Sequence, residues 1–189
     1  MINEKLLQME AFITKINGNL YHVKRVLHIG KLIAEKENIP YNEDALVFAS
    51  YFHDISAWPK YAPDGQFDHA LESSKLMPEL AKGYGYSDDL IEIIVEAVKY
   101  HDKAGLGHYN ETTLIRNADG IDYLGFMAVA RDFAKQPKDM KKAVSALKKR
   151  KEMFAPIIDL AFAKELAAPR IVELDNFIKC FEEESFGIY

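Results

Sequence analysis

Histidines and acidic residues interrupt apolar segments of the sequence, and each interruption falls near the end of a segment. His22 lies in the first turn of one segment, beside Val23 and Val26. In the stretch SYFHDIS, His53 and Asp54 directly follow a run of aromatic and aliphatic residues. Burying an imidazole and a carboxylate without partners would cost several kcal/mol. The sequence therefore indicates that these side chains bind something.

Three further polar residues follow the same pattern. His69 begins one apolar segment, His101 ends another, and Asp119 lies within the stretch LIRNADGIDYLG. Taken singly, each residue is more often a hydrogen-bonded core or capping residue than a ligand. Their recurrence in separate segments favours a shared polar pocket, of the kind in which helical bundles build metal sites. One ion would satisfy two imidazoles and two carboxylates together, with these ligands: His22, His53, Asp54 and Asp119.

Apolar residues recur at helical spacing along nearly the whole chain. The spacing predicts helices over 4–16, 20–36, 42–52, 67–82 and 87–101, a helix from Glu111 through Asp122 toward Phe126 and beyond, a basic helix over 138–153, and two closing helices. Asn42 is a residue type that caps the start of a helix. Irregular loops are expected in the stretches AWPKYAPDGQ and DKAGLGHY. No segment has a convincing strand pattern, so we predict an all-α fold, a helical bundle.

The composition bounds the class of protein. The 189 residues suit one domain or one domain with an appended subdomain. The net charge of -5 gives no general attraction to nucleic acid or to an anionic membrane, and neither is expected as a partner. We find no apolar run of the ~20 residues that span a bilayer and no signal-peptide layout. A lone Cys180 forms no internal disulfide, which favours the reducing cytoplasm as the location.

Three stretches taken in order resemble the HD-domain metal-dependent phosphohydrolases, in their small single-domain bacterial form. They are YHVKRVLHIGKLIAEK, which contains His22, LVFASYFHDIS, which contains His53 and Asp54, and LIRNADGIDYLGFMAVARDF, which contains Asp119. The third resembles the family's "DADRLD…G" segment but has Asn117 before Ala118-Asp119, and Gly120-Ile121 before Asp122. The resemblance covers about residues 18–135. It implies one HD-type helical domain over 1–189, with this motif core and with C-terminal helices over 138–182 packed on it.

The resemblance also implies a divalent ion bound by the two histidines and two aspartates named above. Imidazole nitrogen and carboxylate oxygen suit Mn, Fe, Co, Ni, Zn or Mg, so the identity of the metal stays open. Some members of the superfamily bind a second metal through two further histidines, and His69 and His101 stand at the matching places in the order of the chain. The alternative is that His69 and His101 bind a substrate phosphate or a leaving oxygen.

Phosphoryl transfer needs positioned charges around the ion, and four residues are candidates to supply them. Asp54 is placed to orient the attacking water as well as to bind metal. Arg25 lies one turn after His22 and is our candidate for a phosphate clamp, with a surface salt bridge as the alternative. Lys103 is a weaker candidate for the same role. Asp122, one turn after Asp119, is a supporting carboxylate or a general base, or else a helix cap or a solvated acid.

The leading hypothesis is a phosphohydrolase that acts on an ester or anhydride bond of a small phosphorylated molecule, with a nucleotide favoured. A second hypothesis is a di-iron oxygenase of the same superfamily, which requires His69 and His101 both to bind iron. A third is a module that binds a nucleotide without turning it over. The basic stretch KKAVSALKKRKE is interpreted as a solvated helix face rather than a nucleic-acid site. The oligomeric state stays open, with a homodimer among the options.

Overall fold

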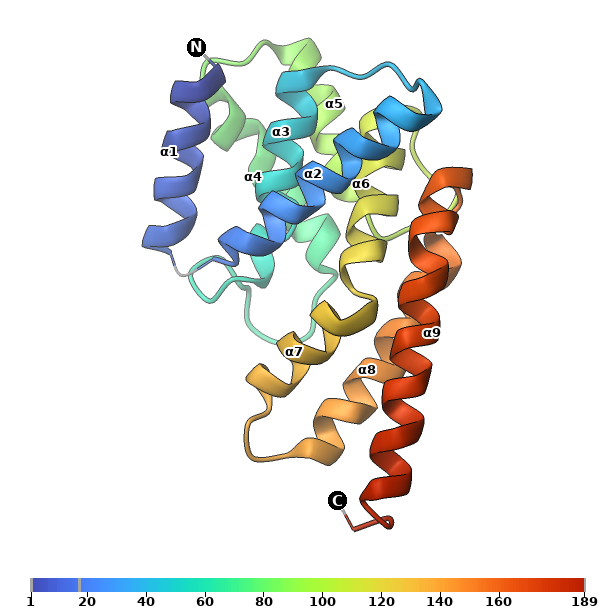
Figure 1. Ribbon diagram of the computed structural model, residues 1–189. Helices are drawn as coiled ribbons and strands as arrows, with labels where there is room; N and C mark the ends of the chain where they lie inside the picture. Colours follow the sequence, from blue (N-terminus) through green and yellow to red (C-terminus); the bar gives the residue numbers. More distant parts are fainter. Residues whose placement is uncertain (1, 17, 189) are drawn as a thin grey trace. The chain divides into compact units, whose positions relative to one another are not determined.

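The structure, a computed structural model, describes residues 2–16 and 18–188, and this part of the chain contains helices and no strand (Figure 1). The predicted all-α fold is confirmed. The α-helices are α1 Ile2–Lys15, α2 Leu20–Glu37, α3 Glu43–Phe52, α4 His69–Gly83, α5 Asp88–Lys99, α6 Asn110–Asp122, α7 Gly125–Lys135, α8 Met140–Phe154 and α9 Ala161–Glu184. Two 3-10 helices, Ile55–Ala57 and Ala155–Ile157, complete the set in the described ranges.

The chain divides into two compact units, Met1–Ala118 and Asp119–Tyr189. The boundary falls within α6, so this helix begins in the first unit and ends in the second. The organisation as a single domain over 1–189 stays a prediction. Among the described residues, no helix has both the length and the apolar character that crossing a membrane requires.

The first unit is built around α3, whose residues 45–52 are all buried. α3 packs against α2 and α5, and α4 packs against α5. Phe48 and Phe52 are among its largest fully buried side chains, with ring centroids 4.6 Å apart, and Phe12 of α1 meets Phe52 edge-on at 5.7 Å. The helix that ends at the His53-Asp54 pair is therefore packed on several sides, and this packing determines where that pair lies.

Side-chain caps set the starts of the helices in the first unit. Asn42 accepts a hydrogen bond from the backbone N–H of Ala45, as its residue type predicts. Asp68 caps α4 by accepting from the N–H of Leu71, so His69 becomes the first residue of that helix. Asn19 caps α2 in the same way, through the N–H of His22. The caps therefore hold His22 and His69 in the first turns of their helices.

The second unit contains α7, α8 and α9, which pack against one another. The basic stretch lies on α8, where Lys148 and Lys151 form ion pairs with Glu182 and Asp175 of α9. Two of the six basic residues of this stretch are therefore paired with acidic residues of the neighbouring helix.

Two predictions about helix boundaries in the second unit are wrong. The helix expected to run past Phe126 ends at Asp122, and a new helix starts at Gly125, whose φ of +71° is a left-handed conformation that breaks a continuous helix. The two closing helices are instead one short 3-10 turn and the long α9, which continues through Pro169. Burial of Ala167 and of Leu174, on either side of the proline, offsets the hydrogen bond that it removes.

Candidate metal centre

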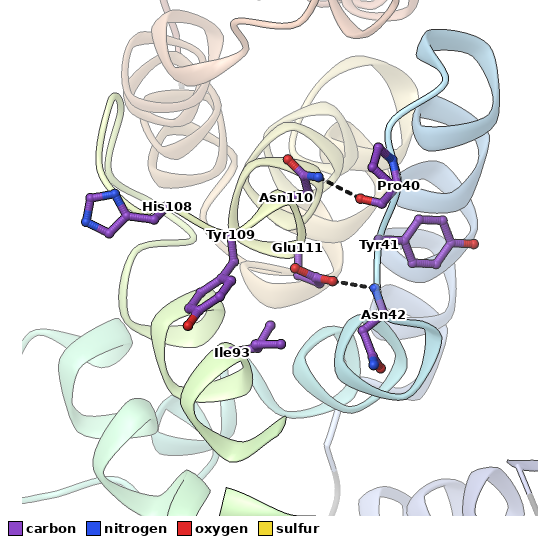
Figure 2. A pocket seen from close by; sticks show the side chains of 8 residues that line it. All are labelled: Pro40, Tyr41, Asn42, Ile93, His108, Tyr109, Asn110 and Glu111. Carbon is purple, nitrogen blue, oxygen red and sulfur yellow. Dashed lines mark hydrogen bonds between the residues drawn. The ribbon is translucent and has the colours of Figure 1, made fainter. Parts of the chain in front are cut away.

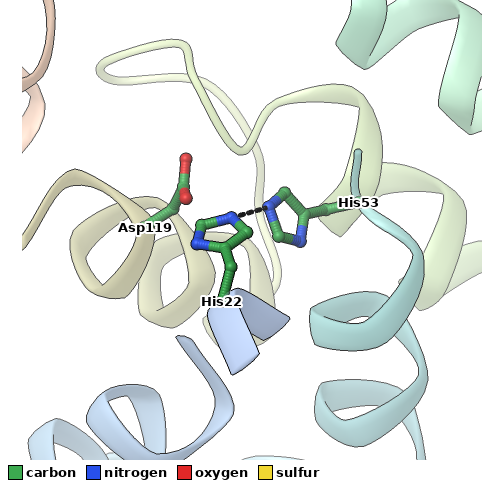
Figure 3. A group of neighbouring side chains, drawn as sticks. All are labelled: His22, His53 and Asp119. Atoms are coloured by element: carbon green, nitrogen blue, oxygen red, sulfur yellow. Dashed lines mark hydrogen bonds between the residues drawn. The ribbon is translucent and has the colours of Figure 1, made fainter. Parts of the chain in front are cut away.

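His22 and His53 face each other in the interior of the first unit. Their Nε2 atoms are 3.3 Å apart, and neither side chain is more than 3% exposed. Figure 3 shows them with Asp119 of α6, which is also buried. Each of the three residues offers one possible ligand atom, and these atoms lie within 4.8 Å of one another. The structure thus brings three of the four predicted ligands of the first ion together.

His69 and His101 form a second pair of the same kind. Their Nε2 atoms are also 3.3 Å apart, His101 is fully buried, and the side chain of His69 is 36% exposed. His69 comes from the first turn of α4, and His101 follows the last turn of α5. Because the exposed edge belongs to His69, this pair faces the side of the cluster that solvent reaches.

Asp54, the fourth predicted ligand, lies between the two histidine pairs. Its Oδ2 is 3.8 Å from Nε2 of His22 and 3.6 Å from Nε2 of His53. Its Oδ1 is 3.3 Å from Nε2 of His69 and 3.5 Å from Nε2 of His101. One carboxylate therefore presents a separate oxygen to each pair.

Backbone carbonyls fix the orientation of two of the imidazoles. Nδ1 of His53 lies 2.9 Å from the carbonyl oxygen of Ser50, and Nδ1 of His101 lies 2.7 Å from that of Val98. A carbonyl oxygen can only accept, so each Nδ1 carries the proton and each Nε2 presents a lone pair to the cluster. Metal-binding histidines are usually oriented by such a hydrogen bond from the other ring nitrogen.

The spacing of these atoms fits metal coordination better than hydrogen bonding. The six distances among the ring nitrogens and Asp54 oxygens given above run from 3.3 to 3.8 Å, longer than the usual N–H···O range of about 2.7–3.2 Å. Ligand atoms bound about 2.1 Å from one ion lie about 3.0 Å apart in octahedral geometry and about 3.4 Å apart in tetrahedral geometry. The donor set of imidazole and carboxylate, at this spacing, can hold divalent ions.

The electrostatic environment of Asp54 keeps it ionised. Burial would raise the pKa of its carboxyl group, but the neighbouring imidazoles of His53, His101 and His69 act in the opposite direction and hold the pKa well below its usual value. A negatively charged carboxylate between four ring nitrogens is the form that binds a cation.

Two acidic residues that the sequence analysis did not single out lie beside His69. Asp102 Oδ2 is 4.0 Å from Nε2 of His69, and Asp68, His69 and Asp102 form a further group of possible ligand atoms within 4.8 Å of one another. Lys103, a predicted substrate contact, donates to Oδ2 of Asp68 at 2.8 Å, and this hydrogen bond is the main cause that lowers the pKa of Asp68. Their positions in the sequence could have indicated them, because Asp68 directly precedes His69 and Asp102 directly follows His101.

The two remaining predicted residues lie on α2 and α6. Arg25 is half-buried on α2, one turn after His22. Asp122 is fully buried and therefore not a solvated acid; it accepts from Arg131 through Oδ2 at 3.3 Å and through its backbone carbonyl at 2.9 Å. The roles of Arg25 as a phosphate clamp and of Asp122 as a base or supporting carboxylate stay predictions.

An open pocket of about 450 Å³ in the first unit shares no residue with the histidine groups (Figure 2). Asn110 donates to the backbone carbonyl of Pro40, and Glu111 accepts from the backbone N–H of Asn42. His108 lines this pocket and is exposed. The two hydrogen bonds tie the connection between α2 and α3 to the first turn of α6, so they support the fold around the cluster.

Solved structures with the same fold come from several bacteria. The crystal structure of Bacillus subtilis YpgQ aligns over 98% of this chain and 98% of its own, with a TM-score of 0.75 and 17% identity. YpgQ in complex with ADP aligns over 97% and 100%, with a TM-score of 0.69 and 18% identity. An HD-superfamily hydrolase from Bacillus thuringiensis aligns over 97% and 98%, with a TM-score of 0.68 and 18% identity. At these identities the likeness establishes the fold, and the predicted HD-domain-like bundle is confirmed.

The family of the chain is shown by comparison with protein-family models. Comparison with curated proteins gives no significant match. The family model described as HD domain matches residues 19–161, which contain every histidine and aspartate of the cluster. This match covers well over half of the 189 residues. The chain therefore belongs to the HD-domain family.

Proposed function

We propose that the protein is a metal-dependent phosphohydrolase that cleaves an ester or anhydride bond of a small phosphorylated substrate, with a nucleotide as the favoured class. The observation that carries the proposal is the position of Asp54, with one oxygen toward His22 and His53 and the other toward His69 and His101. HD domains bind divalent metal ions, and this arrangement offers ligands for them.

Two groups of residues would hold the metal. A first ion would be held by His22, His53, Asp54 and Asp119, and a second by His69 and His101 together with Asp54. Imidazole and carboxylate ligands suit Mn, Fe, Co, Ni, Zn or Mg, and the ligand set does not select among them. When bound, such an ion lowers the pKa of water and polarises the phosphoryl oxygen under attack.

The protein's own groups position the substrate and the water. Asp54 is ionised and accepts a hydrogen bond from the attacking water, which orients it toward phosphorus. Arg25 and Lys103 supply positive charge to the substrate phosphate. Lys103 donates a hydrogen bond to Asp68, so it would have to give up this bond in order to contact the substrate phosphate. Asp122 acts as a general base or as a carboxylate that supports the ligands, and Arg131 keeps it oriented.

Two observations bear on the choice of a nucleotide. YpgQ, which shares the fold at 18% identity, has been crystallised with ADP, and this supports a nucleotide here. Trp58 does not add to the argument, because it is only 7% exposed and packs near Gly18 instead of offering a face to a base. The cytoplasmic location, the homodimer and the absence of nucleic-acid and membrane partners stay predictions.

The test combines turnover with metal content. Purified protein is assayed against a panel of nucleotides and phosphate esters with Mn²⁺, Co²⁺, Ni²⁺ or Mg²⁺ added, and bound metal is measured by mass spectrometry. The His53→Ala variant should lose both metal and turnover while keeping its helicity. His28→Ala, which removes an exposed histidine of α2, should keep both. Metal-loaded protein that turns over none of the panel would count against the proposal.

The spacing of Asp54, His69 and His101 also supports the alternative of a di-iron oxygenase, in which His69 and His101 would both bind iron. Oxygen consumption by the iron-loaded protein with polyols or organophosphonates would distinguish this reaction from hydrolysis. Tight nucleotide binding without turnover under any metal condition would instead favour the non-catalytic module.

A further inference from the structure

The two ion sites of the proposed centre differ in how many ligands have been assigned to them. The first has two imidazoles, the carboxylate of Asp119 and one oxygen of the shared Asp54. The second has two imidazoles and the other oxygen of Asp54. We propose that Asp102 is the missing carboxylate, a ligand of the ion that His69 and His101 hold. This inference rests on the proposed function, because it concerns the second ion of that same centre.

The distance between Asp102 and His69 permits a shared ion. Oδ2 of Asp102 lies 4.0 Å from Nε2 of His69, which itself lies 3.3 Å from both Nε2 of His101 and Oδ1 of Asp54. Two ligand atoms bound about 2.1 Å from one ion are separated by at most about 4.2 Å, the value for opposite positions. This separation is compatible with Asp102 and His69 binding the same ion.

The hydrogen bonding of Asp102 is incomplete in a way that a cation would correct. Its Oδ1 is buried and accepts no hydrogen bond. The nearest basic group is Nζ of Lys103, at 3.8 Å, which is beyond hydrogen-bonding distance. A buried acceptor without a hydrogen bond costs about 1–3 kcal/mol, and more when it is charged. Bidentate coordination to a divalent ion would engage this oxygen together with Oδ2, the oxygen nearer His69, and would offset this cost.

Asp68 also lies beside His69, but both of its carboxylate oxygens already accept hydrogen bonds. Its Oδ1 accepts from the N–H of Leu71 as the cap of α4, and its Oδ2 accepts from Lys103. Its side chain is also 41% exposed, compared with 20% for Asp102. Of the two acids beside His69, only Asp102 has a buried oxygen that lacks a hydrogen bond, so it is the one we assign as a ligand.

The assignment makes the two sites chemically equivalent. Each ion is then held by two imidazoles, one carboxylate of its own and one oxygen of Asp54. The third carboxylate also leaves two divalent ions with a single net positive charge when the imidazoles are neutral. We therefore expect the two ions to bind with similar affinity.

The test is a titration of the metal-free protein with Mn²⁺, followed by calorimetry and by electron paramagnetic resonance, neither of which depends on turnover. The wild type should bind two ions and show the spin coupling of a neighbouring pair. The Asp102→Asn variant should bind the first ion unchanged and the second about tenfold more weakly or worse. The matched control, Asp68→Asn, keeps a capping side chain and should bind both ions as the wild type does.

The other outcomes separate this inference from the proposed function. Two ions of unchanged affinity in Asp102→Asn would overturn the inference and leave the hydrolase proposal intact. The same holds if the wild type binds one ion only. Equal weakening in Asp68→Asn would also overturn it, because general loss of negative charge near His69 would then explain the effect. A wild type that binds no ion would overturn both proposals.

Discussion

Removal of the charge on Asp54 should abolish the stabilisation that metal gives to the fold. The two oxygens of Asp54 face both histidine pairs, and the helices that carry those pairs, or end next to them, are α2, α3, α4 and α5. An ion held at these places links the helices in the folded state only. We therefore expect added Mn²⁺ to raise the melting temperature of the wild type and to have little effect on the Asp54→Asn variant.

The size of the effect follows from ligand linkage. At a free ion concentration about 100 times the Kd, binding to the folded state adds about 2.7 kcal/mol to the free energy of unfolding for each ion. For a chain of this length about 1 kcal/mol shifts the melting temperature by roughly 2–4 °C, which gives about 5–11 °C per ion. If the loss of charge weakens binding about 100-fold, the same concentration adds about 0.4 kcal/mol, or about 1–2 °C.

The assay is thermal unfolding followed by circular dichroism, with chelator-treated protein measured before and after Mn²⁺ is added. The control is Asp64→Asn, which removes an exposed carboxylate from the loop between α3 and α4. This control should show the full wild-type rise. A rise of wild-type size in Asp54→Asn would refute the reasoning, because the ion would then bind somewhere else.

Two further predictions concern titration and substrate binding. Burial and then Glu10, which accepts from the hydroxyl at 3.1 Å, raise the pKa of Tyr51 above its ordinary value of 10.0. The folded state thus retains a proton that the unfolded state loses, so the stability from this group is present below about pH 10 and is lost as pH rises further. Urea unfolding should show a shallower alkaline decline in Tyr51→Phe than in the wild type or in the exposed-site control Tyr21→Phe, and equal slopes would contradict this. The second prediction is that Lys103→Met raises KM for the phosphorylated substrate about tenfold, because one ionic contact is lost. The control, Lys75→Met, removes an exposed lysine of α4 and should leave KM unchanged. Equal KM values for the two variants in steady-state kinetics would show that Lys103 does not contact the substrate.

Helix ends were the part of the site that the sequence predicted well. Asn42, with its capping residue type, and His69, at the start of an apolar segment, both lie where the pattern placed them. The two-residue break after Asp122 was missed, because it depends on the left-handed conformation of Gly125 and the apolar spacing continues across it. The spacing of apolar residues along the chain indicates which face of a helix is buried, but it does not indicate the backbone angles of a single residue.

Distances within the cluster were beyond the reach of the sequence. The order of the histidines placed His69 and His101 at one site, but their 3.3 Å approach depends on how α4 packs against α5. Asp102 was missed for a related reason. It lies after the end of α5, outside any apolar stripe, so only the packed structure brings it within 4.0 Å of His69.

One feature of helix geometry explains why histidines at helix ends suit this site. His53 and His101 each donate from Nδ1 to the carbonyl three residues earlier, at the C-terminal ends of α3 and α5. The last carbonyls of a helix have no partner within the helix, so an imidazole at that point satisfies one of them and becomes fixed as a single tautomer. Its Nε2 lone pair must then point away from the helix, toward the cluster.

The ends of the four helices also match the charges that the proposed reaction brings together. α3 and α5 contribute their C-terminal ends, where the helix dipole favours a cation. α2 and α4 contribute their first turns, through His22 and His69, and at that end the dipole favours an anion. A site built from two ends of each kind is suited to hold divalent ions and a phosphate group at once. A cluster of histidines in the middle of these helices would have the same ligands but neither the fixed tautomers nor this distribution of charge.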